Sequence, residues 1–109
     1  MKFDRKFTIA SFFAVGLLAL VVSFYKQPTF LLLLLGVYSL TALLYYRSFK
    51  LAKIFLFAAI FGALSEIVAV HFGVWSYATP EFLGIPWWLA MVWGHAGIFL
   101  AYTTRYFRF

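Results

Sequence analysis

The sequence lacks cysteine altogether and contains few charged residues. Without cysteine, a disulfide framework, a zinc-thiolate site, a haem-attachment motif and a thiol nucleophile are all excluded. Charged residues make up 11% of the chain, compared with about 25% in a typical soluble domain. Only three residues are acidic, and we find no acidic pair, glycine-rich phosphate loop or Ser–His–Asp pattern. We therefore expect no cofactor.

The chain is rich in apolar residues, as its low content of charged residues suggests. The chain is 66% hydrophobic over 109 residues, and a soluble core of that size could not enclose so many apolar side chains. Lipid has no partner for an open sheet edge, so helices are expected. The sequence predicts an all-α integral membrane four-helix bundle, with residues 1–109 forming a single transmembrane domain. Four apolar segments are each about the 20 residues needed to span a bilayer, and they cover residues 7–25, 28–46, 54–75 and 86–104.

The net charge of +6 comes from basic residues that flank these apolar segments. This distribution is typical of topology signals and contacts to anionic lipid, so we expect membrane lipids and no nucleic acid as partners. With four crossings, Lys26 is alone on one side. The positive-inside rule then predicts a multi-pass protein of the cell membrane with both termini cytoplasmic and the 76–85 loop outside. The other side holds Lys2, Arg5, Lys6, Arg47, Lys50, Lys53, Arg105 and Arg108.

Glu66 is the one acid inside an apolar segment. Helical rotation places it on a face of small residues that includes Gly62 and Gly73, and small residues allow close helix packing. The corresponding small residues of the last segment include Gly94 and Gly97. An acid within a membrane is costly, and this favours a functional role. The alternative is a structural role, in which Glu66 is hydrogen-bonded to a neighbouring helix.

His95 lies at nearly the same predicted depth as Glu66, so the two side chains could meet across the bundle. We therefore treat Glu66 and His95 as candidate catalytic residues. His71 lies nearer the outer interface and on another face, which is typical of a solvated bystander. Neither histidine has the spacing of a metal motif with the other or with Glu66, and no metal site is expected.

Aromatic residues cluster towards the outer end of the last two segments. An aromatic belt at the membrane interface explains most of them, but Trp93 is deeper than a belt requires. Aromatic rings there could line a slot for a long apolar molecule or stabilise a cation. The candidate ligand-binding residues are Trp75, Tyr77, Trp88, Met91 and Trp93.

The stretch "HFGVWSYATPEFLGIPWWLAMVW", with Glu66 before it, resembles the signature segment of bacterioruberin-type carotenoid hydratases, which are membrane proteins of carotenoid biosynthesis. Small uncharacterised four-helix membrane proteins are similar as well, through their "GIP-x-WL…WG" helix start. The resemblance covers residues 62–97, and the matched residues are Glu66, Phe72, Gly73, Trp75, Tyr77, Gly84, Pro86 and Trp93.

This resemblance implies an isoprenoid or carotenoid ligand. Hydration or isomerisation of such a ligand needs an acid that protonates carbon, which would be Glu66, and aromatic walls that tolerate a cation. The sequence leaves open whether the protein is an enzyme. One alternative is a non-catalytic subunit or assembly factor of a larger membrane complex, or a homo-oligomer. Another is a small proton-coupled transporter, although those carry their essential Glu on the first helix.

Overall fold

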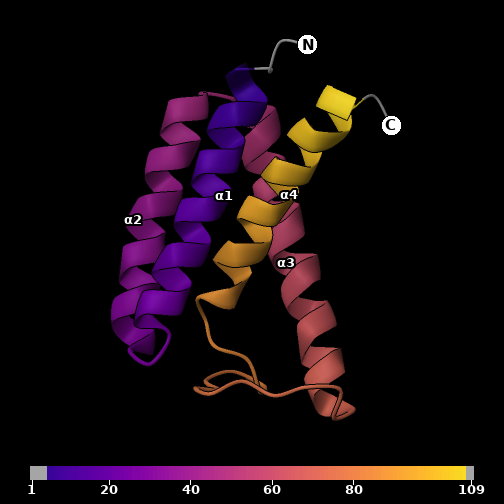
Figure 1. Cartoon of the computed structure of the whole chain (residues 1–109). Coiled ribbons are helices and arrows are strands. Elements are labelled where there is room, and N and C mark those ends of the chain that lie inside the picture. Colours follow the sequence, from indigo (N-terminus) through magenta and orange to yellow (C-terminus); the bar gives the residue numbers. More distant parts are fainter. Residues whose placement is uncertain (1–4, 108–109) are drawn as a thin grey trace.

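The computed structural model describes residues 5–107, which form four helices and no named strand. Lys2 and Arg108, which contributed to the predicted charge asymmetry, lie outside the described residues. The all-α, four-helix prediction is confirmed (Figure 1). The helices are α1 (Arg5–Phe24), α2 (Pro28–Tyr46), α3 (Phe49–His71) and α4 (Leu89–Phe107).

Helix α3 begins five residues earlier than the apolar pattern predicts, because a polar residue caps its N-terminus. The Ser48 side chain accepts a hydrogen bond from the Leu51 amide at 3.2 Å, which satisfies one of the free N–H groups of the first turn. Lys50 and Lys53 therefore belong to the helix and not to a loop. Their long side chains can lie along apolar surface while the ammonium groups reach water.

The same helix ends at His71, four residues earlier than predicted, because Gly73 adopts a left-handed conformation with φ of 76°. The Gly73 amide donates to the Val70 carbonyl at 3.0 Å, and the Val74 amide donates to the Ala69 carbonyl at 2.9 Å. These two bonds form a Schellman motif. No atom lies within 4 Å of the position that a Gly73 Cβ would occupy. Gly73 therefore terminates the helix and does not pack against another helix, contrary to the prediction.

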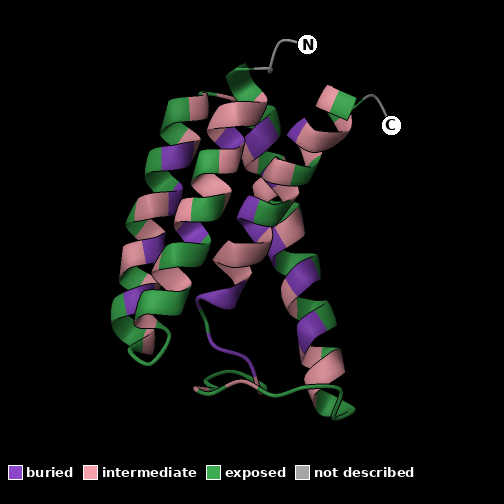
Figure 2. Cartoon of the chain, in the orientation of Figure 1, coloured by how far each residue is buried: buried purple, intermediate pink, exposed green. Residues whose placement is uncertain are grey.

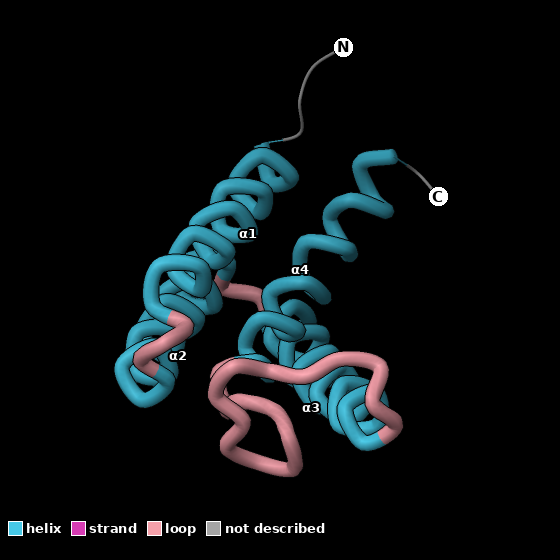
Figure 3. The backbone as a smooth tube through the Cα atoms, turned by 60° about the horizontal axis from the view of Figure 1, so that its bottom comes forward, coloured by secondary structure: helices cyan, strands magenta, loops and turns pink. Residues whose placement is uncertain are grey.

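Helix α4 is the central helix of the bundle. It packs most extensively against α3 and also contacts α1 and α2. It begins at Leu89 instead of residue 86, after a short turn in which the Leu89 amide donates to the Pro86 carbonyl at 3.2 Å. The start of α1 and the end of α4 lie at one end of the bundle, and the loop over residues 72–88 crosses the other end (Figures 1 and 3).

Burial is reversed relative to a soluble protein, because large apolar side chains cover the outside of the bundle (Figure 2). Phe12 is 74% exposed and Leu33 66% exposed, whereas the polar residues Ser39, Glu66 and His95 are buried. Helices α1, α2 and α3 are long and apolar enough to cross a membrane. Helix α4 is not among them, which fits its central position: with neighbours on several sides, it needs fewer apolar side chains on its surface.

Candidate functional site

Glu66 is the centre of a hydrogen-bonded cluster, hereafter the Glu66 cluster, which comprises Glu66, Trp75, Tyr77 and Trp93. The Trp75 indole N–H and the Tyr77 hydroxyl each donate to Glu66 Oε2 at 2.7 Å. The Trp93 indole N–H donates to Glu66 Oε1 at 3.3 Å. An indole N–H can only donate, so Glu66 must act as the acceptor for both tryptophans. The Glu66 side chain is 8% exposed, and its described partners are all neutral donors.

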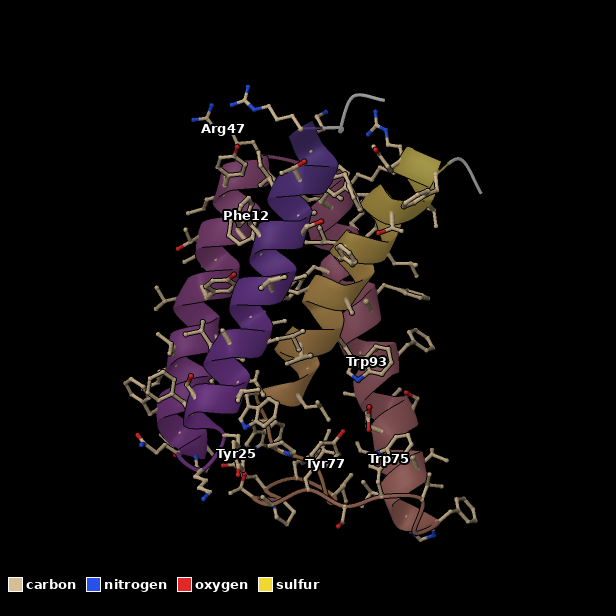
Figure 4. All side chains as sticks on the ribbon, in the orientation of Figure 1. Phe12, Tyr25, Arg47, Trp75, Tyr77 and Trp93 are labelled. Carbon is tan, nitrogen blue, oxygen red and sulfur yellow. The ribbon has the colours of Figure 1, made fainter. Side chains whose placement is uncertain are left out.

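The loop after α3 delivers two of these donors. The left-handed Gly73 turns the chain at the end of α3, so that Trp75 and Tyr77 reach Glu66 from only 9 and 11 residues away in sequence. Figure 4 shows Trp75, Tyr77 and Trp93 in the half of the molecule opposite Arg47. Burial, together with the hydrogen bond to Glu66, raises the pKa of Tyr77 above its usual range. The phenol therefore remains protonated, and remains a donor, at neutral pH.

Trp93 joins the cluster from α4 because Gly62 leaves room for its ring. A Cβ on Gly62 would overlap Cγ and Cδ2 of Trp93, so the indole lies directly against the α3 backbone. Gly94 and Gly97 also lie where these helices approach. A Cβ on Gly94 would come within 2.6 Å of the Phe55 ring, and one on Gly97 within 2.5 Å of the Ala58 Cβ.

His95 belongs to a separate polar site. Its Nε2 lies 3.0 Å from the hydroxyl of Ser39 on α2, and the side chain is 3% exposed. The rings of Tyr38 and Phe55 flank the imidazole, with centroids 5.4 and 5.3 Å from its own. The described residues contain no hydrogen bond between His95 and Glu66. The reason is rotational: Trp93 and His95 are two residues apart, or about 200° around α4, so the face that reaches Glu66 cannot also present the histidine.

The remaining predicted site residues take other positions. Trp88 is buried in an apolar cluster with Leu17, Leu31 and Leu35, and Met91 packs against the same cluster. Trp93 and Tyr77 also pack against this cluster, but neither Trp88 nor Met91 forms a hydrogen bond with Glu66 among the described residues. His71 is exposed at the end of α3 and stacks edge-on with Phe72. Among residues 5–107, no three His, Cys, Asp or Glu side chains gather closely enough to hold a metal ion.

A groove between α3 and α4, hereafter the α3–α4 groove, lies beside the Glu66 cluster. Its volume is about 790 Å³. Small residues of both helices line it alongside larger apolar side chains, and Lys53 is its only basic lining residue among those described. Trp93 lines the groove, whereas Glu66 and His95 do not. The principal lining residues are Lys53, Ala58, Phe61, Gly62, Trp93 and Gly97.

Ser39 is the buried polar residue that sequence reasoning missed. It lies within an apolar helix, and a lone serine there carries little signal, because its hydroxyl can bond to the preceding turn. The spacing of Ser39 along the helix does indicate that it is buried. Leu31, Leu35 and Ser39 follow each other at four-residue spacing and form the buried face of α2, so Ser39 points inwards.

Comparisons of the chain with protein-family models, with curated proteins and with solved structures found no match. The functional argument therefore depends on the geometry of this chain alone.

Proposed function

We propose that this protein is a multi-pass protein of the cell membrane that binds the apolar chain of an isoprenoid or another lipid in the α3–α4 groove. The apolar outer surface supports the membrane location, since side chains such as Phe12 and Leu33 would otherwise face water. The molecule measures 42 × 28 × 25 Å, and its long dimension equals the thickness of a bilayer with its headgroups, about 40–45 Å.

The α3–α4 groove is the single observation that carries the binding function. Its volume of about 790 Å³ lies within the range of roughly 300–1,000 Å³ typical of small-molecule sites. Small residues at Ala58, Gly62 and Gly97 give it depth, and Phe61 and Trp93 give it aromatic surface. Lys53 supplies a cation at the basic end of the bundle, which suits an amphiphile with a polar or anionic headgroup.

An amphiphile fits this groove better than a second copy of the chain does. Two copies inserted in the same orientation place their basic ends at the same depth. Lys53 of one copy would then lie near the cations of the other, and like charges at an interface are unfavourable. A lipid headgroup brings no such repulsion.

Glu66 has a positioning role in this proposal. It accepts a hydrogen bond from Trp93 and does not line the groove, so it fixes the aromatic ring without reaching the ligand. Resemblance to carotenoid hydratases makes an isoprenoid or carotenoid the first ligand to test. Because Glu66 lies behind Trp93, the geometry supports binding more directly than proton transfer.

The decisive experiment is purification from a mild detergent followed by mass spectrometry of the co-purified lipids and pigments. We expect an isoprenoid or other long-chain lipid at a fixed ratio to the protein. Ala96, an exposed residue that lines the groove, provides the test variant, since Ala96→Phe fills the groove without disturbing the core. The matched control is Ala19→Phe, at an exposed alanine of α1.

Loss of the lipid in Ala96→Phe and its retention in Ala19→Phe would support the proposal. Equal retention in both variants would refute it. Recovery of an obligate protein partner in place of a lipid would favour the subunit function. Conversion of an added isoprenoid by the wild type, abolished in Glu66→Gln while lipid binding is retained, would favour a proton-transfer role for Glu66.

The proposed orientation, with both termini cytoplasmic, has its own test. Because the native chain contains no cysteine, single cysteines report the side of the membrane without background. We expect Ala78→Cys in the 72–88 loop to react with an impermeant maleimide from outside, and Arg47→Cys to react only after the membrane is opened. The reverse pattern would invert the topology.

A further inference from the structure

A second cavity, hereafter the basic cavity, opens at the end of the bundle where α1 begins and α4 ends. Its volume is about 420 Å³, and all four helices contribute to its lining. Ile54 and Ala101 line both this cavity and the α3–α4 groove, so the two border each other at the contact between these helices. Its polar lining residues include Arg5, Lys6, Tyr46, Ser48, Lys50 and Arg105.

Among residues 5–107, the charged side chains that line the basic cavity are all cationic. Four cationic side chains line it, and the described residues contain only two carboxylates, Glu66 and Glu81. Both carboxylates are engaged at the far end, Glu66 with its cluster and Glu81 with the Trp87 amide at 3.3 Å. Asp4, the third acid of the chain, lies outside the described residues. An anion would therefore find several cations and no described carboxylate facing it.

Tyr46 adds an unsatisfied polar group next to the basic cavity. Its hydroxyl is buried and has no hydrogen-bond partner, although the residue lines the cavity. A buried hydroxyl without a partner is unfavourable. Because the oxygen itself is closed off from the cavity, a ligand there supplies the missing bond only if the Tyr46 ring turns towards it. The hydroxyl can donate to an anionic oxygen in the same way as the neighbouring Ser48 side chain.

We propose that the basic cavity is a binding site for a phosphate group. Arginine guanidinium groups match phosphate oxygens with paired N–H donors, and lysine adds a compact charge. The site is distinct from the α3–α4 groove, and its occupation does not depend on a ligand there. Since the cavity opens at the end of the bundle where helices begin and end, the phosphate can belong to a lipid headgroup or be free in water.

The experiment separates these two sources. The full-length protein is reconstituted in phosphatidylcholine nanodiscs that contain a graded fraction of phosphatidic acid, and native mass spectrometry counts the retained phosphatidic acid. In the second arm, inorganic phosphate is titrated into phosphatidylcholine-only nanodiscs, and thermal shift is followed. We expect saturable binding of one phosphate group per protein. Binding in the first arm alone identifies a lipid headgroup, and binding in both arms identifies a site that also accepts free phosphate.

Two variants of matched charge test the location. Arg105→Gln removes a cation from the cavity, and we expect it to weaken binding about tenfold, as for loss of a charge-assisted hydrogen bond. Arg47→Gln removes a cation at the same end that does not line the cavity, and we expect a change of less than about twofold because exposed charges are screened. Equal losses in both variants would show a non-specific surface charge and overturn the proposal.

Tyr46→Phe provides a test that removes no charge and keeps the ring. We expect weaker phosphate binding with an unchanged or higher melting temperature in phosphate-free buffer, because the unpartnered hydroxyl is removed. Should Arg105→Gln fail to fold, Lys50→Gln removes a cation from the same cavity in its place. Undiminished binding in Tyr46→Phe would show that the hydroxyl does not contact the phosphate. Absence of saturable binding by the wild type would refute the proposal.

Discussion

Glu66 and His95 are both buried in an apolar bundle, but the structure satisfies them in different ways. Glu66 accepts hydrogen bonds from three neutral donors, two of which come from a loop 9 and 11 residues away. Among residues 5–107, His95 has a single hydrogen-bond partner, Ser39, which is 56 residues away. The difference shows that a buried acid and a buried base in one apolar domain need not form a pair. Each is stabilised by whichever polar groups its own helix face reaches.

The largest expected effect in this comparison is that of Glu66→Ala. Three donors lose their acceptor, and at about 0.6–2 kcal/mol for each bond the bundle should lose roughly 2–6 kcal/mol of stability. The measurement is denaturation of the purified protein in detergent, followed by tryptophan fluorescence. Glu66→Gln should lose less, because one carbonyl oxygen remains as an acceptor while the amide N–H₂ opposes one donor.

Glu81 is the matched control for this prediction. Its carboxylate lies in the exposed part of the loop and, among residues 5–107, accepts one hydrogen bond, from the Trp87 amide at 3.3 Å. Glu81→Ala should change stability by less than about 0.5 kcal/mol, as is usual at exposed sites. If Glu66→Ala were no more destabilising than Glu81→Ala, the Glu66 cluster would not be what holds the loop against α3.

We expect an intermediate loss of stability for Gly62→Ala, which tests whether Gly62 makes room for Trp93 in the Glu66 cluster. The added methyl group overlaps the Trp93 ring, and overpacking of this kind costs about 1–3 kcal/mol. Gly36→Ala is the control, because its methyl group would meet only Met91 Cε at 3.8 Å, an ordinary contact. In a Trp93→Ala background, which removes Cγ and Cδ2 of the indole, the penalty of Gly62→Ala should shrink. An unchanged penalty there would mean that the Trp93 ring is not the obstacle.

The smallest expected effect is that of Ser39→Ala, which addresses the His95 site. Removing the hydroxyl leaves His95 Nε2 without its partner and should cost about 1 kcal/mol. Ser11→Ala is the matched control, since the Ser11 hydroxyl donates only to the Phe7 carbonyl of its own helix at 2.9 Å. The double variant Ser39→Ala, His95→Phe removes both hydrogen-bond partners, and we expect it to regain part of the stability lost in Ser39→Ala. A loss as large as that of Glu66→Ala would contradict the distinction between the two sites.

The boundaries of α3 show where an apolar pattern fails to predict the ends of a helix. Helix α2 follows its apolar segment, with Pro28 in its first turn, and it has the bounds that the pattern predicts. Helix α3 is displaced towards the N-terminus because Ser48 caps its start and Gly73 ends it. Both signals are present in the sequence, but the apolar run masks them. The displacement matters, since it places Trp75 in a loop that can turn back towards Glu66.

The sequence by itself determined the helical class, the number of helices and the concentration of basic residues in the segments that flank them. These properties depend on the composition of local segments, which can be counted along the chain. Only the tertiary structure decided that Glu66 meets Trp75, Tyr77 and Trp93, that His95 meets Ser39, and that α3 and α4 enclose a groove. The physical reason is that a hydrogen bond depends on helix rotation, on the exact residue at which a helix ends and on the path of the following loop. A shift of one residue turns a helical side chain by about 100°, and hydropathy does not encode that angle.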